Sequence, residues 1–83
     1  MLGGEDKMIE QLRETAGMGG PAASLANELL VLAEQRQAGQ LSAEEYQFLL
    51  QQIAEVRAAQ ELASDEQAMR YIVQAANVLA TVV

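Results

Sequence analysis

The acidic residues are the side chains of this sequence best suited to direct chemistry, and the candidate pairs are Glu44 with Glu45 and Asp65 with Glu66. Two carboxylates can share acid and base roles, or supply oxygen ligands to a divalent cation. Each pair, however, falls in the first turn of an expected helix, where acidic residues stabilise the positive end of the helix dipole. No ring of acidic residues or calcium-binding loop spacing accompanies them. We therefore expect both pairs to be structural, and we predict no catalytic residue and no metal site.

The sequence also lacks histidine and cysteine. Their absence removes the commonest general base, the thiol nucleophile and the two side chains that bind transition metals best. The glycine-rich stretch 17–21 precedes an expected helix, as a phosphate-binding loop does, but we expect no strand before it. We predict a protein that is not an enzyme and that holds no cofactor.

Composition indicates the fold class. Of the 83 residues, 51% are hydrophobic, and much of that share is alanine. Alanine, leucine, glutamate and glutamine dominate, and all four favour helices. Aromatic residues are few, and β-branched residues do not alternate as they would in strands. We predict an all-α protein with one helical domain over residues 21–83, preceded by a flexible or short-helix segment over residues 1–20.

The charge and length of the chain limit the kinds of partner that we expect it to bind. Twelve acidic residues against five basic ones give a net charge of −7. Direct contact with nucleic acid is disfavoured because phosphate binding needs a stripe of lysine and arginine. A mimic of nucleic acid would carry dense rows of carboxylates, which this chain lacks. A chain this short has a thin margin of stability, and without disulfides oligomerisation is the natural source of further burial.

Two segments of the chain bear on export and on membrane insertion, residues 1–4 and residues 71–83. Residues 1–4 lead straight into the charged residues Glu5, Asp6 and Lys7, without the apolar core of a secretory signal. Residues 71–83 would span about 20 Å as a helix, short of the roughly 30 Å hydrocarbon layer. We expect no transmembrane span, and a location in the cytoplasm or within a viral particle.

The N-terminal part predicts a helix over residues 5–16 with a small apolar patch. That patch consists of Met8, Ile9 and Leu12. It is too small to hold the helix by itself, so we expect this helix to fray or to order on a partner. The glycines and the proline of residues 17–21 end it and form a flexible joint.

A helical hairpin is expected next, over residues 22–38 and 42–63. The first helix starts at Pro21 or at Ser24 as its N-cap, and Gly39 ends it. Ser42 and Glu45 form a capping box, so the second helix starts at Ser42. Its apolar stripe is expected at Tyr46, Leu49, Leu50, Ile53, Val56, Arg57, Gln60 and Ala63.

Ser64 with Gln67 resembles a second capping box, but no glycine or proline accompanies it. Two architectures stay open. A break near Ser64 gives a compact bundle with a separate C-terminal helix over residues 65–83. A continuous helix over residues 42–83 gives a rod of about 60 Å that demands oligomerisation.

The C-terminal segment 71–83 carries no charged side chain. Apolar residues recur there at helical spacing and form one stripe. The stripe comprises Met69, Ile72, Val73, Ala76, Leu79, Ala80 and Val83. A helix whose polar side is narrow and nearly uncharged is usually covered, and here we expect the cover to come from outside the chain. The row opposite the stripe is then an interface, an ordinary surface, or a face that lies on a membrane or lines the lumen of an assembled ring. That row is Gln67, Arg70, Gln74, Asn77 and Thr81.

Three further residues complete the expected interface. Phe48 stands among polar residues, as an exposed anchor or as a contact to a neighbouring helix. Arg57 lies on an apolar stripe, where it snorkels, pairs with Glu61 or bridges to another subunit. Tyr71 is expected at a rim with its hydroxyl in water.

These observations predict a self-associating structural or assembly protein, held by its C-terminal helix as a homo-oligomer or a repeated subunit of a larger complex. A small virion or phage assembly subunit is one such protein. Two alternatives stay open: a small acidic binding module or inhibitor of a host protein, using the face of Glu44, Glu45 and Phe48, and a helical protein that lies on a membrane surface.

Overall fold

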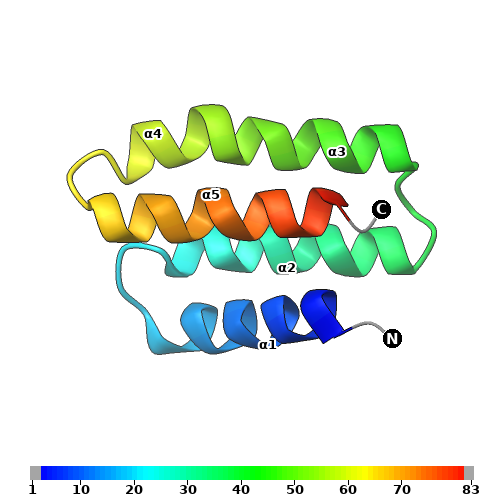
Figure 1. Ribbon diagram of the computed structural model, residues 1–83, viewed down its shortest axis with the longest axis horizontal. Coiled ribbons are helices and arrows are strands. Elements are labelled where there is room, and N and C mark those ends of the chain that lie inside the picture. Colours follow the sequence, from blue (N-terminus) through cyan, green and yellow to red (C-terminus); the bar gives the residue numbers. More distant parts are fainter. Residues whose placement is uncertain (1–2, 82–83) are drawn as a thin grey trace.

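The computed structural model describes residues 3–81, and the elements in that range are all helical (Figure 1). The helices are α1 (Gly3–Met18), α2 (Ala23–Gln37), α3 (Ala43–Gln52), η1 (Ile53–Arg57), α4 (Ala58–Glu61) and α5 (Glu66–Thr81). The π-helical turn η1 joins α3 to α4, so these three elements form one continuous helical segment. The predicted all-α class and the helical hairpin, α2 followed by α3–α4, are confirmed.

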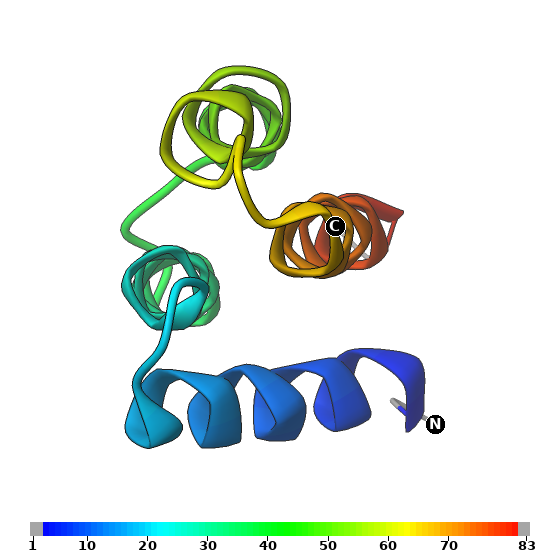
Figure 2. The ribbon, with the colours of Figure 1, turned by 90° about the vertical axis from the view of Figure 1, so that its left-hand side faces the viewer.

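The helices α2, α3–α4 and α5 run back and forth along one direction and form a triangle when viewed end-on (Figure 2). Helix α1 crosses obliquely beneath them and packs against α2 and α5. The core lies inside this arrangement and draws on every long helix. Its largest fully buried side chains are Leu12, Leu25, Leu29, Tyr46, Leu50, Ile72 and Leu79.

Helix α1 belongs to this bundle. It begins at Gly3, earlier than the expected start at residue 5, and Leu12 has none of its surface exposed. Met8 is also buried, and Ile9 packs against the core. The expectation that this helix frays or orders on a partner is therefore wrong, because α2 and α5 complete the burial of its small apolar patch.

Glycines form the turns on either side of α2. Gly19 and Gly20 have φ angles of 78° and 92°, and Gly39 has a φ of 79°, a region that residues with a side chain rarely adopt. Gly39 follows the end of α2 as predicted, whereas α1 runs to Met18, two residues beyond its expected end at residue 16. The N-cap of α2 is Ala22, which is buried and has no side-chain cap. Ser24 is not the cap, because the helix has already begun before it.

Helix α3 begins as predicted. The Ser42 hydroxyl accepts a hydrogen bond from the Glu45 backbone N–H at 3.1 Å, and the Glu45 carboxylate accepts one from the Ser42 N–H at 2.9 Å. The capping box satisfies two backbone donors that a helix start otherwise leaves open.

The π-helical turn η1 was not predicted, and it moves the buried stripe by one residue. The Ala58 N–H donates to the Ile53 carbonyl, five residues back. Beyond this turn, Ala58 and Leu62 are buried, whereas Val56 is 39% exposed. The expected stripe through Val56, Arg57, Gln60 and Ala63 is therefore wrong, because the turn brings alanine and leucine to the core and keeps arginine outside it.

The helical segment ends at Glu61, and α5 begins at Glu66, so the break near Ser64 is confirmed over the continuous rod. The cap, however, is Asp65 and not Ser64. The Asp65 carboxylate accepts a hydrogen bond from the Ala68 N–H at 3.1 Å. The second predicted capping box, Ser64 with Gln67, does not form.

Candidate interaction surfaces

The inner face of α5 is covered by the chain itself. Ile72, Ala76 and Leu79 are at most 1% exposed, and Ala75 is fully buried beside them. These residues pack against the other helices of the same copy. Ile72, Ala76 and Leu79 were expected at a contact with another subunit, and that expectation is corrected: a partner cannot touch them while the bundle is closed.

The other predicted residues of the stripe lie nearer the surface. Met69, Val73 and Ala80 are half-buried and pack against the edge of the core. Val83 lies outside the described residues. The apolar stripe is therefore divided between the core and a strip of surface beside α3.

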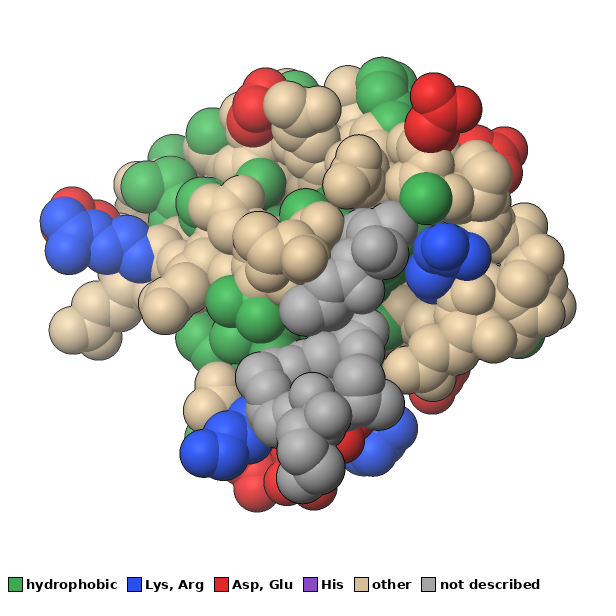
Figure 3. Space-filling view, turned by 45° about the vertical axis from the view of Figure 1, so that its right-hand side comes forward, with side chains coloured by type: hydrophobic (Ala, Val, Ile, Leu, Met, Phe, Trp, Pro, Cys, Tyr) green, Lys and Arg blue, Asp and Glu red, His purple; other side chains and the backbone are tan. Residues whose placement is uncertain are grey.

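The outer face of α5 is uncharged beyond Arg70. Gln74, Asn77 and Thr81 are exposed along it, with half-buried Val73 and Val78 on its two sides. These side chains line a shallow hollow. The single ion pair of this helix, Arg70 with Glu66 at 2.8 Å, lies in its first turns. Figure 3 shows this side of the molecule: green and tan side chains lie to the left of the grey atoms, and red and blue groups lie at the far left, the top, the right and the bottom.

Tyr71 does not lie at a wet rim. Its side chain is half-buried, and its hydroxyl accepts a hydrogen bond from the Thr15 hydroxyl at 3.2 Å. Because Thr15 belongs to α1, this contact ties α5 to α1 within one copy, and Tyr71 serves the fold.

A groove runs between α2 and α3, on the side of the bundle away from α5. Val31 and Leu32 line it from α2, and Phe48 and Leu49 line it from α3. Phe48 is 59% exposed and Val31 is 41% exposed. Phe48 was expected either as an exposed anchor or as a contact to a neighbouring helix, and it has features of both. Its ring lines a groove shared with α2, yet most of its surface is open to solvent.

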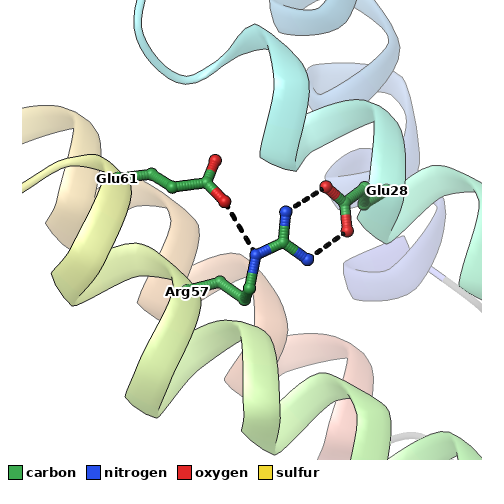
Figure 4. Close-up of polar contacts among 3 residues, drawn as sticks. All are labelled: Glu28, Arg57 and Glu61. Carbon is green, nitrogen blue, oxygen red and sulfur yellow. Dashed lines mark hydrogen bonds and ion pairs between the residues drawn. The ribbon is translucent and has the colours of Figure 1, made fainter.

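The predicted pairing of Arg57 with Glu61 is confirmed, and a second partner joins it at the edge of this groove. The second partner is Glu28. The two terminal nitrogens of Arg57 donate to the Glu28 carboxylate at 2.7 and 2.8 Å, and the Arg57 Nε donates to Glu61 at 2.7 Å (Figure 4). The two hydrogen bonds to Glu28, and then the one to Glu61, raise the pKa of Arg57 above its ordinary value. Both acids belong to the same chain, so Arg57 pairs within one copy, and its bridge to another subunit stays a prediction.

The acidic pairs have structural surroundings. Glu45 belongs to the capping box of α3, and Asp65 caps α5. Hydrogen bonds from the backbone and hydroxyl of Ser42 lower the pKa of Glu45 below its ordinary value of 4.5. Among the described side chains of residues 6–81, no three acidic groups gather closely enough to hold a metal ion.

Sequence reasoning missed Glu28, Val31 and the groove itself. The signal available for Val31 was the width of the apolar stripe on α2, which is too broad for one neighbouring helix to cover. Nothing in the sequence indicated that Glu28 faces Arg57.

None of the helices in the described part of the chain has the length and apolar character required to cross a membrane. Comparison with protein-family models, with curated proteins and with solved structures finds no match to this chain.

Proposed function

We propose that this protein is a non-enzymatic assembly protein and that its copies associate through the outer face of α5. The observation that carries the proposal is the absence of charge along that face beyond Arg70, on a chain with a net charge of −7. Like-charged molecules repel one another, and the repulsion is weakest where both surfaces are neutral. The outer face of α5 is therefore the side on which two copies approach at the lowest electrostatic cost.

The side chains of this face suit pairing with their own kind. Gln74 and Asn77 are exposed, and each amide both donates and accepts hydrogen bonds. A two-fold axis brings identical residues together, so such amides can pair across it without leaving an unmatched charge. Met69, Val73 and Val78 add apolar surface on either side.

The size of the outer face of α5 determines how strong we expect the association of two copies to be. Helix α5 has 16 residues, which correspond to a length of about 24 Å. A contact along one such helix is small beside the roughly 800 Å² that each partner of a stable complex buries. We therefore expect weak association that depends on concentration. A repeated subunit in a larger particle, such as a virion, would gain from many such contacts.

The test compares two identical substitutions at exposed helical positions. Gln74→Glu places a charge on the outer face of α5, and Gln60→Glu places the same charge on α4. Mass measured by light scattering over a range of concentrations should rise for the parent and for Gln60→Glu, but stay at one copy for Gln74→Glu. A parent that stays monomeric throughout, or a Gln74→Glu variant that associates like the parent, would refute the proposal.

A further inference from the structure

The α2–α3 groove, lined by Val31, Leu32, Phe48 and Leu49, points to a second interaction that self-association does not use. We propose that it binds an amphipathic helix of another protein, one that carries lysine or arginine beside its apolar stripe. Three features support this occupant: the form of the groove, the exposed anchor within it and the charge around it.

The form of the groove suits a helix. On the opposite side of the pair formed by α2 and α3–α4, the equivalent groove already holds a helix. Helix α5 packs there, with Ile72, Ala76 and Leu79 facing inward. Viewed end-on, α5 occupies one side of the helix pair, and no described helix covers the other (Figure 2). Two neighbouring helices present a groove parallel to their axes on each side, and amphipathic helices bind in such grooves.

Phe48 supplies the anchor. It is 59% exposed, and with Val31, 41% exposed, it leaves two large apolar side chains of one groove in contact with solvent. Large exposed aromatic residues at the centre of an apolar patch are typical of positions that carry much of a binding energy. The π-helical turn η1 borders the same groove through Ile53 and Arg57, and such turns occur often at functional sites.

The charge around the groove selects a basic partner. Among the described residues that line it, Arg57 is the one base, and the two carboxylates that pair with it, Glu28 and Glu61, leave one negative charge in excess at that end. Glu44 and Glu45 precede Phe48 by four and three residues, which places them one turn away on the same side of α3. Carboxylates therefore border both ends of an apolar floor, and a partner with basic flanks complements them. A second copy, with a net charge of −7, would add repulsion.

The experiment uses the full chain and two fluorescent peptides with the same leucine stripe at helical spacing. One carries lysine beside the stripe, and the other carries glutamate at the same positions. We expect fluorescence anisotropy to show binding of the lysine peptide, weakened by added salt, and at least about ten-fold weaker binding of the glutamate peptide. Phe48→Ala should weaken binding of the lysine peptide about ten-fold or more.

Met18→Ala is the matched control, because Met18 is 82% exposed and lies outside the groove. It should bind the lysine peptide like the parent. Absence of binding, equal binding of both peptides or an unchanged Phe48→Ala variant would overturn the proposal. So would a loss of self-association in Phe48→Ala, because a second copy would then be the occupant. If Gln74→Glu loses self-association but still binds the lysine peptide, only the α5 face is affected, and this proposal stands.

Discussion

Two serines precede helices in this chain, and only one of them caps. Ser42 bonds the Glu45 N–H, whereas Asp65, the residue after Ser64, caps α5. We expect Ser42→Ala to lower the free energy of unfolding by about 1 kcal/mol, because the first turn of α3 loses an acceptor. Ser64→Ala should stay within about 0.5 kcal/mol of the parent. Urea unfolding of both variants tests this, and equal losses would contradict the observed caps.

The other half of the same capping box makes stability depend on pH. The pKa of Glu45 is lower in the folded chain than its ordinary value of 4.5. A group with a lowered pKa stabilises the fold at pH values above its unfolded pKa, and that contribution is lost as the pH falls through the folded pKa. We expect Glu45→Gln to be less stable than the parent at neutral pH, and the difference to vanish well below pH 4.5.

The control for that pH series is Glu44→Gln, which removes a neighbouring carboxylate that has no part in the capping box. Unfolding followed across the series should show a smaller difference between this variant and the parent. A gap between Glu45→Gln and the parent that persists unchanged into acid would show that the carboxylate does not act through its charge.

The caps also show what single residues could reveal in advance. The Ser42 box was predictable because Ser42 and the glutamates that follow it, Glu44 and Glu45, agree on one start. At residues 64–67 the same logic chose the wrong residue, since Ser64 and Asp65 can each accept from a helix N–H. Which of the two turns toward the helix depends on how the chain leaves Leu62, a buried residue. That choice is tertiary and leaves no mark in the local sequence.

Among the elements, α1 departs most from expectation. We expect Leu12→Ala to cost about 2–5 kcal/mol of unfolding free energy, because it leaves a cavity beneath a side chain that is 0% exposed. Met18→Ala, at the exposed end of the same helix, should change stability by no more than about 0.5 kcal/mol. Thermal or urea unfolding would measure both. Near-equal, small effects would mean that α1 is only loosely attached.

The π-helical turn marks the boundary of what periodicity can predict. A fixed α-helical repeat predicts that the stripe continues from Ile53 to Val56 and Arg57, because it assumes the same rotation angle for every residue. The structure inserts an extra residue there and reaches Ala58 and Leu62 instead. The gain is a buried alanine and leucine together with an arginine that meets Glu28 on another helix. Glu28 is 29 residues away along the chain, beyond the reach of any local pattern.

At the level of the whole molecule, a single copy is already compact. Its Cα radius of gyration is 11.8 Å, close to the value of about 12 Å expected for a folded domain of this length. The sequence predicted that protein from outside the chain covers the apolar stripe of α5. For Ile72, Ala76 and Leu79 that prediction is wrong, because the same copy buries them. The cover comes from α1, α2, α3 and η1 together, and no local pattern in α5 shows that these elements surround it.

The central claim is that the two faces of α5 have different tasks, the inner one in folding and the outer one in association. Adjacent residues on those faces give the most direct test. Ala76 is 1% exposed and Asn77 is exposed. Both Ala76→Glu and Asn77→Glu are to be followed by urea unfolding and by light scattering over a range of concentrations.

Ala76→Glu should destabilise the fold by several kcal/mol at every protein concentration, because it buries an unpaired carboxylate within one copy. Asn77→Glu should keep the parent's stability to within about 0.5 kcal/mol, yet stay at the mass of one copy where the parent's mass rises. The opposite pattern would contradict the account: an Ala76→Glu chain as stable as the parent that loses only association, beside an Asn77→Glu chain that still associates.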